Sequence, residues 1–173
     1  MVRRRKNKRT ERNLKKRARL WPELDANMVW DYTQSDGFVH IPRTMPYFFR
    51  IMDECSKSKP LSSTYFSLWC RCWDESGIIK IDNPSILADE SGFSGQRKIT
   101  TWRTRMRILE KLGFIQTKPN MSEEHGYVVL LNPYKVSKSL HENGTYKDEG
   151  WINALYDRAE DIKADDLDDE SDE

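Results

Sequence analysis

The chain has 173 residues, 33% of them charged, and a mean hydropathy of −0.83. These values fit one modest hydrophobic core with polar extensions better than two full domains. No apolar run approaches the roughly 20 residues that cross a bilayer, and no uninterrupted apolar stretch follows the basic N-terminus as it would in a signal peptide. We therefore expect a cytoplasmic protein without membrane partners, and we expect its three cysteines to be reduced thiols.

Charge is distributed unevenly along the chain, although the formal net charge is only +1. Residues 1–19 carry eleven lysines and arginines, among them Arg3, Arg4 and Arg5, against one glutamate. Residues 157–173 carry ten acidic side chains against two basic ones. Segments with so few apolar residues do not fold alone. We predict a basic arm at 1–20, either flexible or made helical by a polyanion, and an acidic tail at 164–173.

Local patterns in the first half of the chain predict short elements separated by turn formers. An apolar run before Pro42 indicates a strand at 38–41, and apolar residues at helical spacing indicate helices at 47–55 and 62–75. A strand at 78–81 and a short helix that ends near residue 90 follow. The aromatic residues expected to pack together in the core are Tyr65, Phe66, Trp69, Trp73 and Trp102.

In the second half, Gly92 and Gly95 mark a tight turn before an uninterrupted helical stretch. This helix is predicted from Gln96 to Leu112, and Gly113 closes it. Strands at 114–118 and 127–131 enclose a polar loop and so predict a hairpin. Further helices are predicted at 133–141 and 151–162.

The stretch ILADESGFSGQRKITTWRTRMRILEKLGFIQT resembles the helix-turn-helix of the winged-helix superfamily. The match lies in Leu87-Ala88, in Ser91-Gly92-Phe93 and in Leu112-Gly113-Phe114-Ile115. GYVVLLNPYKV is similar to the second wing strand of plasmid replication initiators and phage replisome organisers. The resemblance implies an α+β, mostly α, winged helix-turn-helix domain at 38–142 and a C-terminal helix at 143–163. It also implies duplex DNA as the ligand and a homodimer, with the helices at 47–55 or 134–162 as the interface.

The helix at 96–112 is amphipathic. Its predicted core stripe consists of Ile99, Trp102, Met106 and Leu109. The opposite face holds Arg97, Thr100, Thr101, Thr104 and Arg107, with Arg103 beside them and with Lys98 and Arg105 on the other flank. Between Gln96 and Lys111 six residues are basic and one is acidic, so charge is concentrated on this helix.

Such a face suits the major groove, where arginine pairs with guanine, glutamine pairs with adenine, and threonine reaches bases or phosphates. Base or groove contacts are predicted for Gln96, Arg97, Thr100, Thr101 and Thr104. Phosphate contacts are predicted for Ser94, Lys98, Arg103, Arg105 and Arg107, and for the arm residues Arg3, Arg4 and Arg5. Lys118 and Asn120 are candidates for a neighbouring groove. Glu123 and Glu124 would oppose phosphate, so we expect the tip of the hairpin loop to face away from DNA.

The favoured function is sequence-specific duplex DNA binding, by a transcriptional regulator or by a plasmid or phage replication or partition factor of the bacterial cytosol or nucleoid. The alternatives are a protein-interaction adaptor in a replication or segregation complex, whose acidic tail holds a protein partner, and an RNA-binding protein that uses the basic arm. Scattered histidines and the one-residue spacing of Cys70 and Cys72 indicate neither nucleophilic catalysis nor a metal site. No nucleotide-binding glycine loop is present, so we expect neither an enzyme nor a cofactor.

Overall fold

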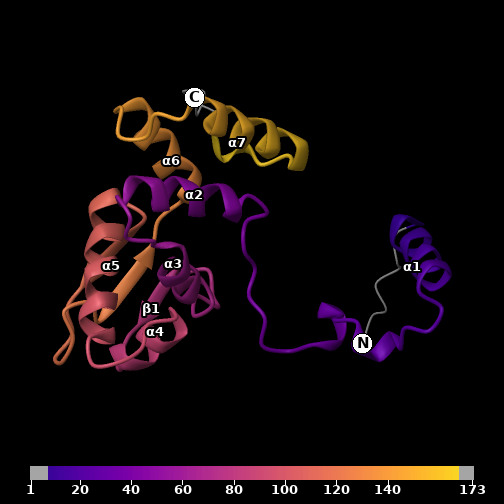
Figure 1. Ribbon diagram of the computed structural model, residues 1–173, viewed down its shortest axis with the longest axis horizontal. Coiled ribbons are helices and arrows are strands. Elements are labelled where there is room, and N and C mark those ends of the chain that lie inside the picture. Colours follow the sequence, from indigo (N-terminus) through magenta and orange to yellow (C-terminus); the bar gives the residue numbers. More distant parts are fainter. Residues whose placement is uncertain (1–7, 168–173) are drawn as a thin grey trace. The chain divides into compact units, whose positions relative to one another are not determined.

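The computed structural model describes residues 8–167, which divide into a first unit that ends at Phe38 and a second unit that begins at Val39 (Figure 1). Each unit is described by itself. Together they form an α+β protein that is mostly helical and has one small antiparallel sheet. None of the helices in this range combines the length and the apolar content that a membrane span requires.

The first unit contains one α-helix and two short 3-10 turns. Helix α1 (Lys8–Leu20) occupies most of the predicted arm, because lysine, arginine, alanine and leucine favour a helix and the first proline comes only at Pro22. The turns η1 (Ala26–Met28) and η2 (Tyr32–Gln34) are capped by Asp25 and Asp31. Each carboxylate accepts a hydrogen bond of 2.9 Å from the backbone NH two residues later. Arg3, Arg4 and Arg5 lie outside the described residues.

Large apolar side chains are exposed throughout the segment that follows α1. They are Leu20, Trp21, Leu24, Met28, Trp30, Tyr32 and Phe38. The rings of Tyr32 and Phe38 meet edge to face, with their centroids 6.2 Å apart, but neither ring is buried. Residues 20–38 also carry four carboxylates and no lysine or arginine. The segment is therefore both apolar and acidic.

The predicted strand at 38–41 is wrong. These residues are irregular, and the strands that pair in the described part of the chain lie elsewhere. A strand is stabilised by hydrogen bonds to a neighbour, so an apolar run that meets no partner strand does not become one.

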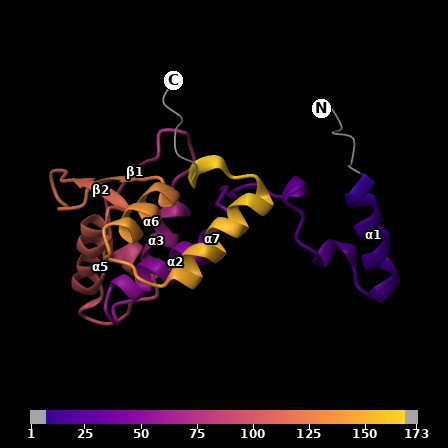
Figure 2. The ribbon, with the colours of Figure 1, turned by 90° about the horizontal axis from the view of Figure 1, so that it is seen from above.

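The second unit alternates helices with three short strands (Figures 1 and 2). In chain order its elements are α2 (Met45–Cys55), α3 (Ser62–Trp69), β1 (Ile78–Lys80), α4 (Pro84–Glu90), α5 (Lys98–Leu112), β2 (Ile115–Lys118), β3 (Tyr127–Leu130), α6 (Pro133–Glu142), α7 (Glu149–Ile162) and the 3-10 turn η3 (Asp165–Leu167). Helix α3 ends six residues earlier than predicted. The backbone NH groups of Arg71 and Cys72 bond to carbonyls three residues back, as in a turn, and Trp73 is left 83% exposed.

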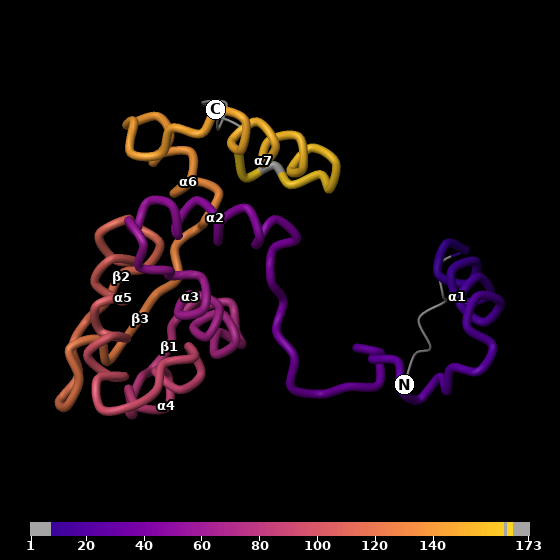
Figure 3. Tube along the Cα trace, viewed as in Figure 1, coloured from indigo at the N-terminus to yellow at the C-terminus, as the bar shows by residue number. Residues whose placement is uncertain are grey.

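The sheet has the strand order β1-β3-β2, with both pairs antiparallel. Strand β3 is central because Val129 lies opposite both Ile78 of β1 and Gln116 of β2. The chain passes from β3 almost directly into α6, as the trace in Figure 3 shows. Asn132 caps this helix, with its side-chain oxygen accepting a 2.9 Å bond from the NH of Tyr134.

The core lies between the sheet and helices α2, α3 and α5. Trp102, Met106 and Leu109 of α5 are fully buried, as their spacing predicts. Ile99, in the first turn of the helix, is only half-buried. The ring of Tyr65 meets that of Phe114 at 5.6 Å between centroids, so α3 also packs against the segment that follows α5. These contacts fix which face of α5 points outward.

Helix α2 contributes Phe48, Ile51 and Met52 to the same core. Leu140 of α6 and Leu155 of α7 are buried in the same core, so the helices predicted at 47–55 and within 134–162 as dimer elements all use their apolar side chains within this unit. The start of the acidic tail also packs on this unit. Leu167 is buried, and Asn132 donates a hydrogen bond of 2.7 Å to the carboxylate of Asp166. Tail residues 168–173 lie outside the described part of the chain.

Candidate nucleic-acid interface

A two-glycine turn joins α4 to α5 and sets the direction in which α5 begins. Gly92 and Gly95 have φ angles of +81° and +76°, a backbone conformation that L side chains rarely adopt. Between them, the NH of Phe93 bonds back to the carbonyl of Ala88 at 2.9 Å, and Ala88 is fully buried. Helices α4 and α5 therefore pack directly against each other.

The turn before α5 and the first part of the helix present an open polar face, formed by Ser94, Gln96, Arg97, Thr100 and Thr104. The helix begins at Lys98, two residues later than predicted, so the first three of these residues precede it. The first four are exposed, whereas Thr104 is half-buried and donates its hydroxyl to the carbonyl of Thr100 at 2.9 Å. Within the described part of the chain, no hydrogen bond or ion pair engages the Arg97 guanidinium. We call these five residues the open face. Thr101, predicted to belong with them, is half-buried at its edge.

Two of the predicted phosphate-binding cations already have partners on the other flank of α5. The Lys98 ammonium lies 2.7 and 2.6 Å from the two carboxylate oxygens of Asp89 on α4. Arg105 donates to the carbonyl of Pro60 at 3.0 Å, and its guanidinium lies 5.7 Å from the centre of the Phe93 ring. Burial lowers the pKa of Arg105. These cations hold α5 against its neighbours and are turned away from the open face.

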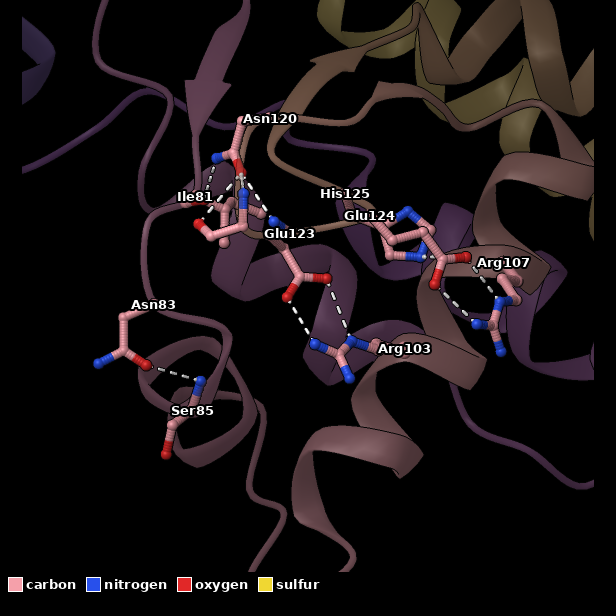
Figure 4. A network of polar contacts seen from close by, with 10 residues as sticks. Ile81, Asn83, Ser85, Arg103, Arg107, Asn120, Glu123, Glu124 and His125 are labelled. Atoms are coloured by element: carbon pink, nitrogen blue, oxygen red, sulfur yellow. Dashed lines mark hydrogen bonds and ion pairs between the residues drawn. The ribbon is translucent and has the colours of Figure 1, made fainter.

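The two remaining arginines of the predicted phosphate set bind the β2–β3 loop, residues 119–126 (Figure 4). Arg103 pairs with Glu123 through two hydrogen bonds of 3.1 and 2.7 Å. Arg107, one helical turn later, pairs with Glu124 through two bonds of 2.9 and 2.7 Å. Each guanidinium meets its carboxylate as a fork, which is the strongest geometry for this pair of groups. The loop thus neutralises two of the five cations of α5.

Asn120 organises the loop so that its two glutamates reach α5 (Figure 4). The side-chain oxygen of Asn120 accepts hydrogen bonds from the NH groups of Ser122 and Glu123, at 2.9 and 2.8 Å. Its amide nitrogen donates to the carbonyl of Ile81 at 3.0 Å. A Cβ atom at Gly126 would lie 2.3 Å from Asn120 Cγ, so only glycine fits there. Asn120 therefore serves the loop itself, whereas Lys118, the other predicted groove residue of the hairpin, is exposed.

His125 closes the loop from inside the protein. Its ring is buried, lies edge to face with Trp102 at 6.0 Å between centroids, and places Nδ1 at 3.2 Å from the hydroxyl of Thr117. Burial lowers the pKa of His125, although Glu124, Glu110 and Glu123 oppose this shift. The hydrogen bonds from Arg103 and Arg107 lower the pKa of Glu123 and of Glu124 respectively. Near neutral pH the loop therefore carries two carboxylates and a neutral imidazole.

Acidification is expected to destabilise the second unit in two steps. The pKa of His125 in the folded protein lies below its ordinary 6.5, so below about pH 6.5 the unfolded chain binds a proton at this residue more readily than the folded chain does. The free energy of unfolding therefore falls as the pH drops below about 6.5. The pKa of Glu123 also lies below its ordinary 4.5, so its contribution is present above about pH 4.5 and is lost as the pH falls through the lowered value.

Melting temperatures of the wild type and of a His125→Gln variant, measured from pH 7.5 to pH 3, test this expectation. The variant should lack the first step and keep the second. A wild-type melting temperature that does not change between pH 7 and pH 5.5 would contradict the role given to His125.

Comparisons with protein-family models, with curated proteins and with solved structures give no match. The case for a function therefore rests on the geometry of α5 and the loop beside it. One part of that geometry was missed by the sequence argument: the acidic loop is bound to the basic helix. Its signal was present in two arginines spaced by one helical turn, Arg103 and Arg107, and in two adjacent glutamates of the hairpin loop, Glu123 and Glu124.

Proposed function

We propose that this protein binds duplex DNA in a sequence-specific manner, as a winged helix-turn-helix protein whose recognition helix is α5. The order of elements from α3 to β3, with a three-stranded sheet in the order β1-β3-β2, fits this architecture. In it, α4 and α5 form the helix-turn-helix and the β2–β3 loop forms the wing.

The observation that carries the proposal is the open face of α5. It gathers a guanidinium and an amide from the turn before α5 with hydroxyl groups on the N-terminal half of the helix, the end that reaches base edges in related motifs. Arginine and glutamine are the side chains that recognise guanine and adenine through two hydrogen bonds. The core contacts of Trp102 and Met106 fix the orientation of α5, so its polar face points outward before a ligand arrives.

An Arg97→Ala variant tests the proposal against an Arg158→Ala control. A duplex selected from a random pool by the wild-type protein is used as the probe in mobility-shift titrations. We expect the Arg97 variant to bind this duplex about tenfold more weakly or worse and to lose preference over a scrambled duplex, because one good base contact contributes roughly 1–3 kcal/mol of discrimination. Arg158 carries the same charge on α7, where it pairs with Asp161, and its loss should leave binding unchanged.

Equal binding by the wild type and the Arg97 variant would contradict the proposal that α5 is the recognition helix.

The proposed biological role is that of a transcriptional regulator or a plasmid or phage replication or partition factor, acting as a homodimer in the cytosol or nucleoid. Such proteins read symmetric sites, so the selected duplex should be palindromic or nearly so.

A protein-interaction adaptor is the second candidate, and the exposed segment after α1 favours it. Residues 20–38 present several large apolar side chains together with four carboxylates, which suits a protein surface that offers apolar pockets bordered by lysine or arginine. Nucleic acid suits this segment less well because its phosphates would face those carboxylates. If no duplex is enriched from the random pool, the adaptor function replaces DNA binding.

A further inference from the structure

We infer that the β2–β3 loop is an internal competitor for the DNA backbone: Glu124 occupies the Arg107 guanidinium in the free protein and gives way to a phosphate, whereas the Glu123–Arg103 pair stays closed. This inference rests on the proposed function, and it assigns a specific residue to the regulation of the same surface.

The two ion pairs differ in burial, and this difference decides which of them opens. The side chain of Glu123 is 1% exposed, whereas those of Glu124 and Arg107 are 48% and 57% exposed. When a buried charge loses its partner, it has neither a counter-ion nor water around it, and this costs free energy. An exposed ion pair opens readily, because water solvates both groups. A phosphate can therefore reach Arg107 from solvent, but it cannot displace Glu123 without leaving a buried carboxylate unpaired.

The chemistry of the exchange is symmetrical. A guanidinium binds a carboxylate and a phosphate through the same two parallel hydrogen bonds. The bonds of 2.9 and 2.7 Å from Arg107 to Glu124 are of the kind that a backbone phosphate would receive. Glu124 thus stands where a phosphate oxygen pair would stand, and the exchange keeps the number of hydrogen bonds on Arg107 unchanged.

The loop holds the competitor in place before DNA arrives. Asn120 bonds to two backbone NH groups of the loop and to the carbonyl of Ile81, and the next residue after Glu124, His125, is buried against Trp102. Because the loop is already ordered, closing the Arg107–Glu124 pair costs little additional entropy. The free protein therefore shows less positive charge to any duplex than its count of arginines indicates.

The Arg107–Glu124 pair should weaken the binding of DNA that does not depend on base sequence. Phosphate contacts supply most of the non-specific affinity, so a cation that must first be released contributes less of it. Within the described residues, no hydrogen bond or ion pair joins Arg107 or Glu124 to the side chains of the open face, so that face keeps its capacity for base contacts. Glu124 is, in this view, a specificity-determining residue that never contacts a base.

A double-mutant cycle on Glu124 and Arg107 tests the inference. Affinities for a duplex of unrelated sequence are measured over a series of salt concentrations. Glu124→Gln should bind about threefold more tightly near 100 mM salt, because Arg107 no longer has to be released, and the slope of log K against log salt should stay the same, since Arg107 contacts one phosphate in both complexes. In an Arg107→Ala background the same substitution should change the affinity much less and leave the slope unaltered.

Both substitutions lie at exposed positions. Thermal melting of each variant serves as the control that the variant is folded. The matched double variant also separates release of Arg107 from the simple removal of a negative charge, because the charge is removed in both backgrounds. A Glu124→Gln effect of equal size with and without Arg107 would overturn the inference.

Nuclear magnetic resonance of the arginine side chains provides a direct second measurement. The Nε–H signals of Arg103 and Arg107 are assigned from single substitutions and followed as the selected duplex is added. Arg107 should shift on binding while Arg103 does not. A fixed Arg107 signal at saturating duplex, or a shifted Arg103 signal, contradicts the inference. If the proposed function itself is wrong, a different result is expected: the Arg97→Ala variant binds the selected duplex with the same affinity as the wild type.

Discussion

Replacing Trp102 by alanine is expected to lower the free energy of unfolding of the second unit by about 3–5 kcal/mol, the range found for large aromatic side chains lost from a packed core. Trp102 is fully buried in the first half of α5 and packs edge to face against the ring of His125 in the β2–β3 loop. Its loss leaves a cavity between the helix and that loop. The same change should loosen both ion pairs of the loop, since both arginines project from the same helix.

Trp73→Ala is the matched control, because it removes the same side chain from a position that is 83% exposed. We expect this variant to lie within about 0.5 kcal/mol of the wild type. Urea unfolding followed by far-ultraviolet circular dichroism suits both variants, since it does not depend on tryptophan fluorescence. Comparable losses in the two variants would mean that the core is not centred on α5.

The two tryptophans also show which part of the fold the sequence could predict. Both were expected in the core because both fit the spacing of an amphipathic helix. The burial of Trp102 is confirmed, because α5 continues unbroken for 15 residues and residues at helical spacing therefore share one face along the whole helix. For Trp73 it is wrong, because α3 ends at Trp69, and helical spacing predicts nothing beyond the end of the helix.

Phe66 is a different case, since it lies within α3 and is nevertheless 42% exposed. A short helix packs along one stripe, and Thr64, Tyr65, Ser67 and Leu68 are its buried residues. Polarity alone would place Phe66 inside and Thr64 and Ser67 outside. What decides their places is which neighbouring elements cover the helix, and that information is not local.

The arginines of α5 show the same limit at the candidate site. The helical period correctly separates the buried stripe from the polar side, so the open face could be predicted from the sequence. The partners of Arg103 and Arg107 could not, because they lie 20 and 17 residues away in a loop whose path is set by Asn120 and Gly126. A count of charges on a helix therefore overstates the charge that is free to bind.

The basic arm should contribute most of the salt dependence of duplex binding, because residues 1–19 carry eleven lysines and arginines against one glutamate. Helix α1 carries seven lysines and arginines against Glu11, and none of its residues is buried. All of them except Arg17 lie on one face of the helix at 100° per residue, and a straight helix meets the curved backbone of a duplex over only part of its length, so we expect about half of them to contact phosphates at once. Three to four phosphate contacts would make the plot of log K against log salt steeper by about 3.

Deleting residues 1–19 should therefore flatten that plot and spare the preference for the selected duplex. Raising the salt fourfold, from 50 to 200 mM, should cost the full chain about 60-fold more affinity than it costs the truncated chain. A variant with the eleven lysines and arginines of residues 1–19 changed to glutamine keeps the length and the helix propensity of the arm and should behave like the deletion. If the glutamine variant instead keeps the wild-type slope, the salt dependence originates in the second unit, and the arm has a role other than binding phosphate.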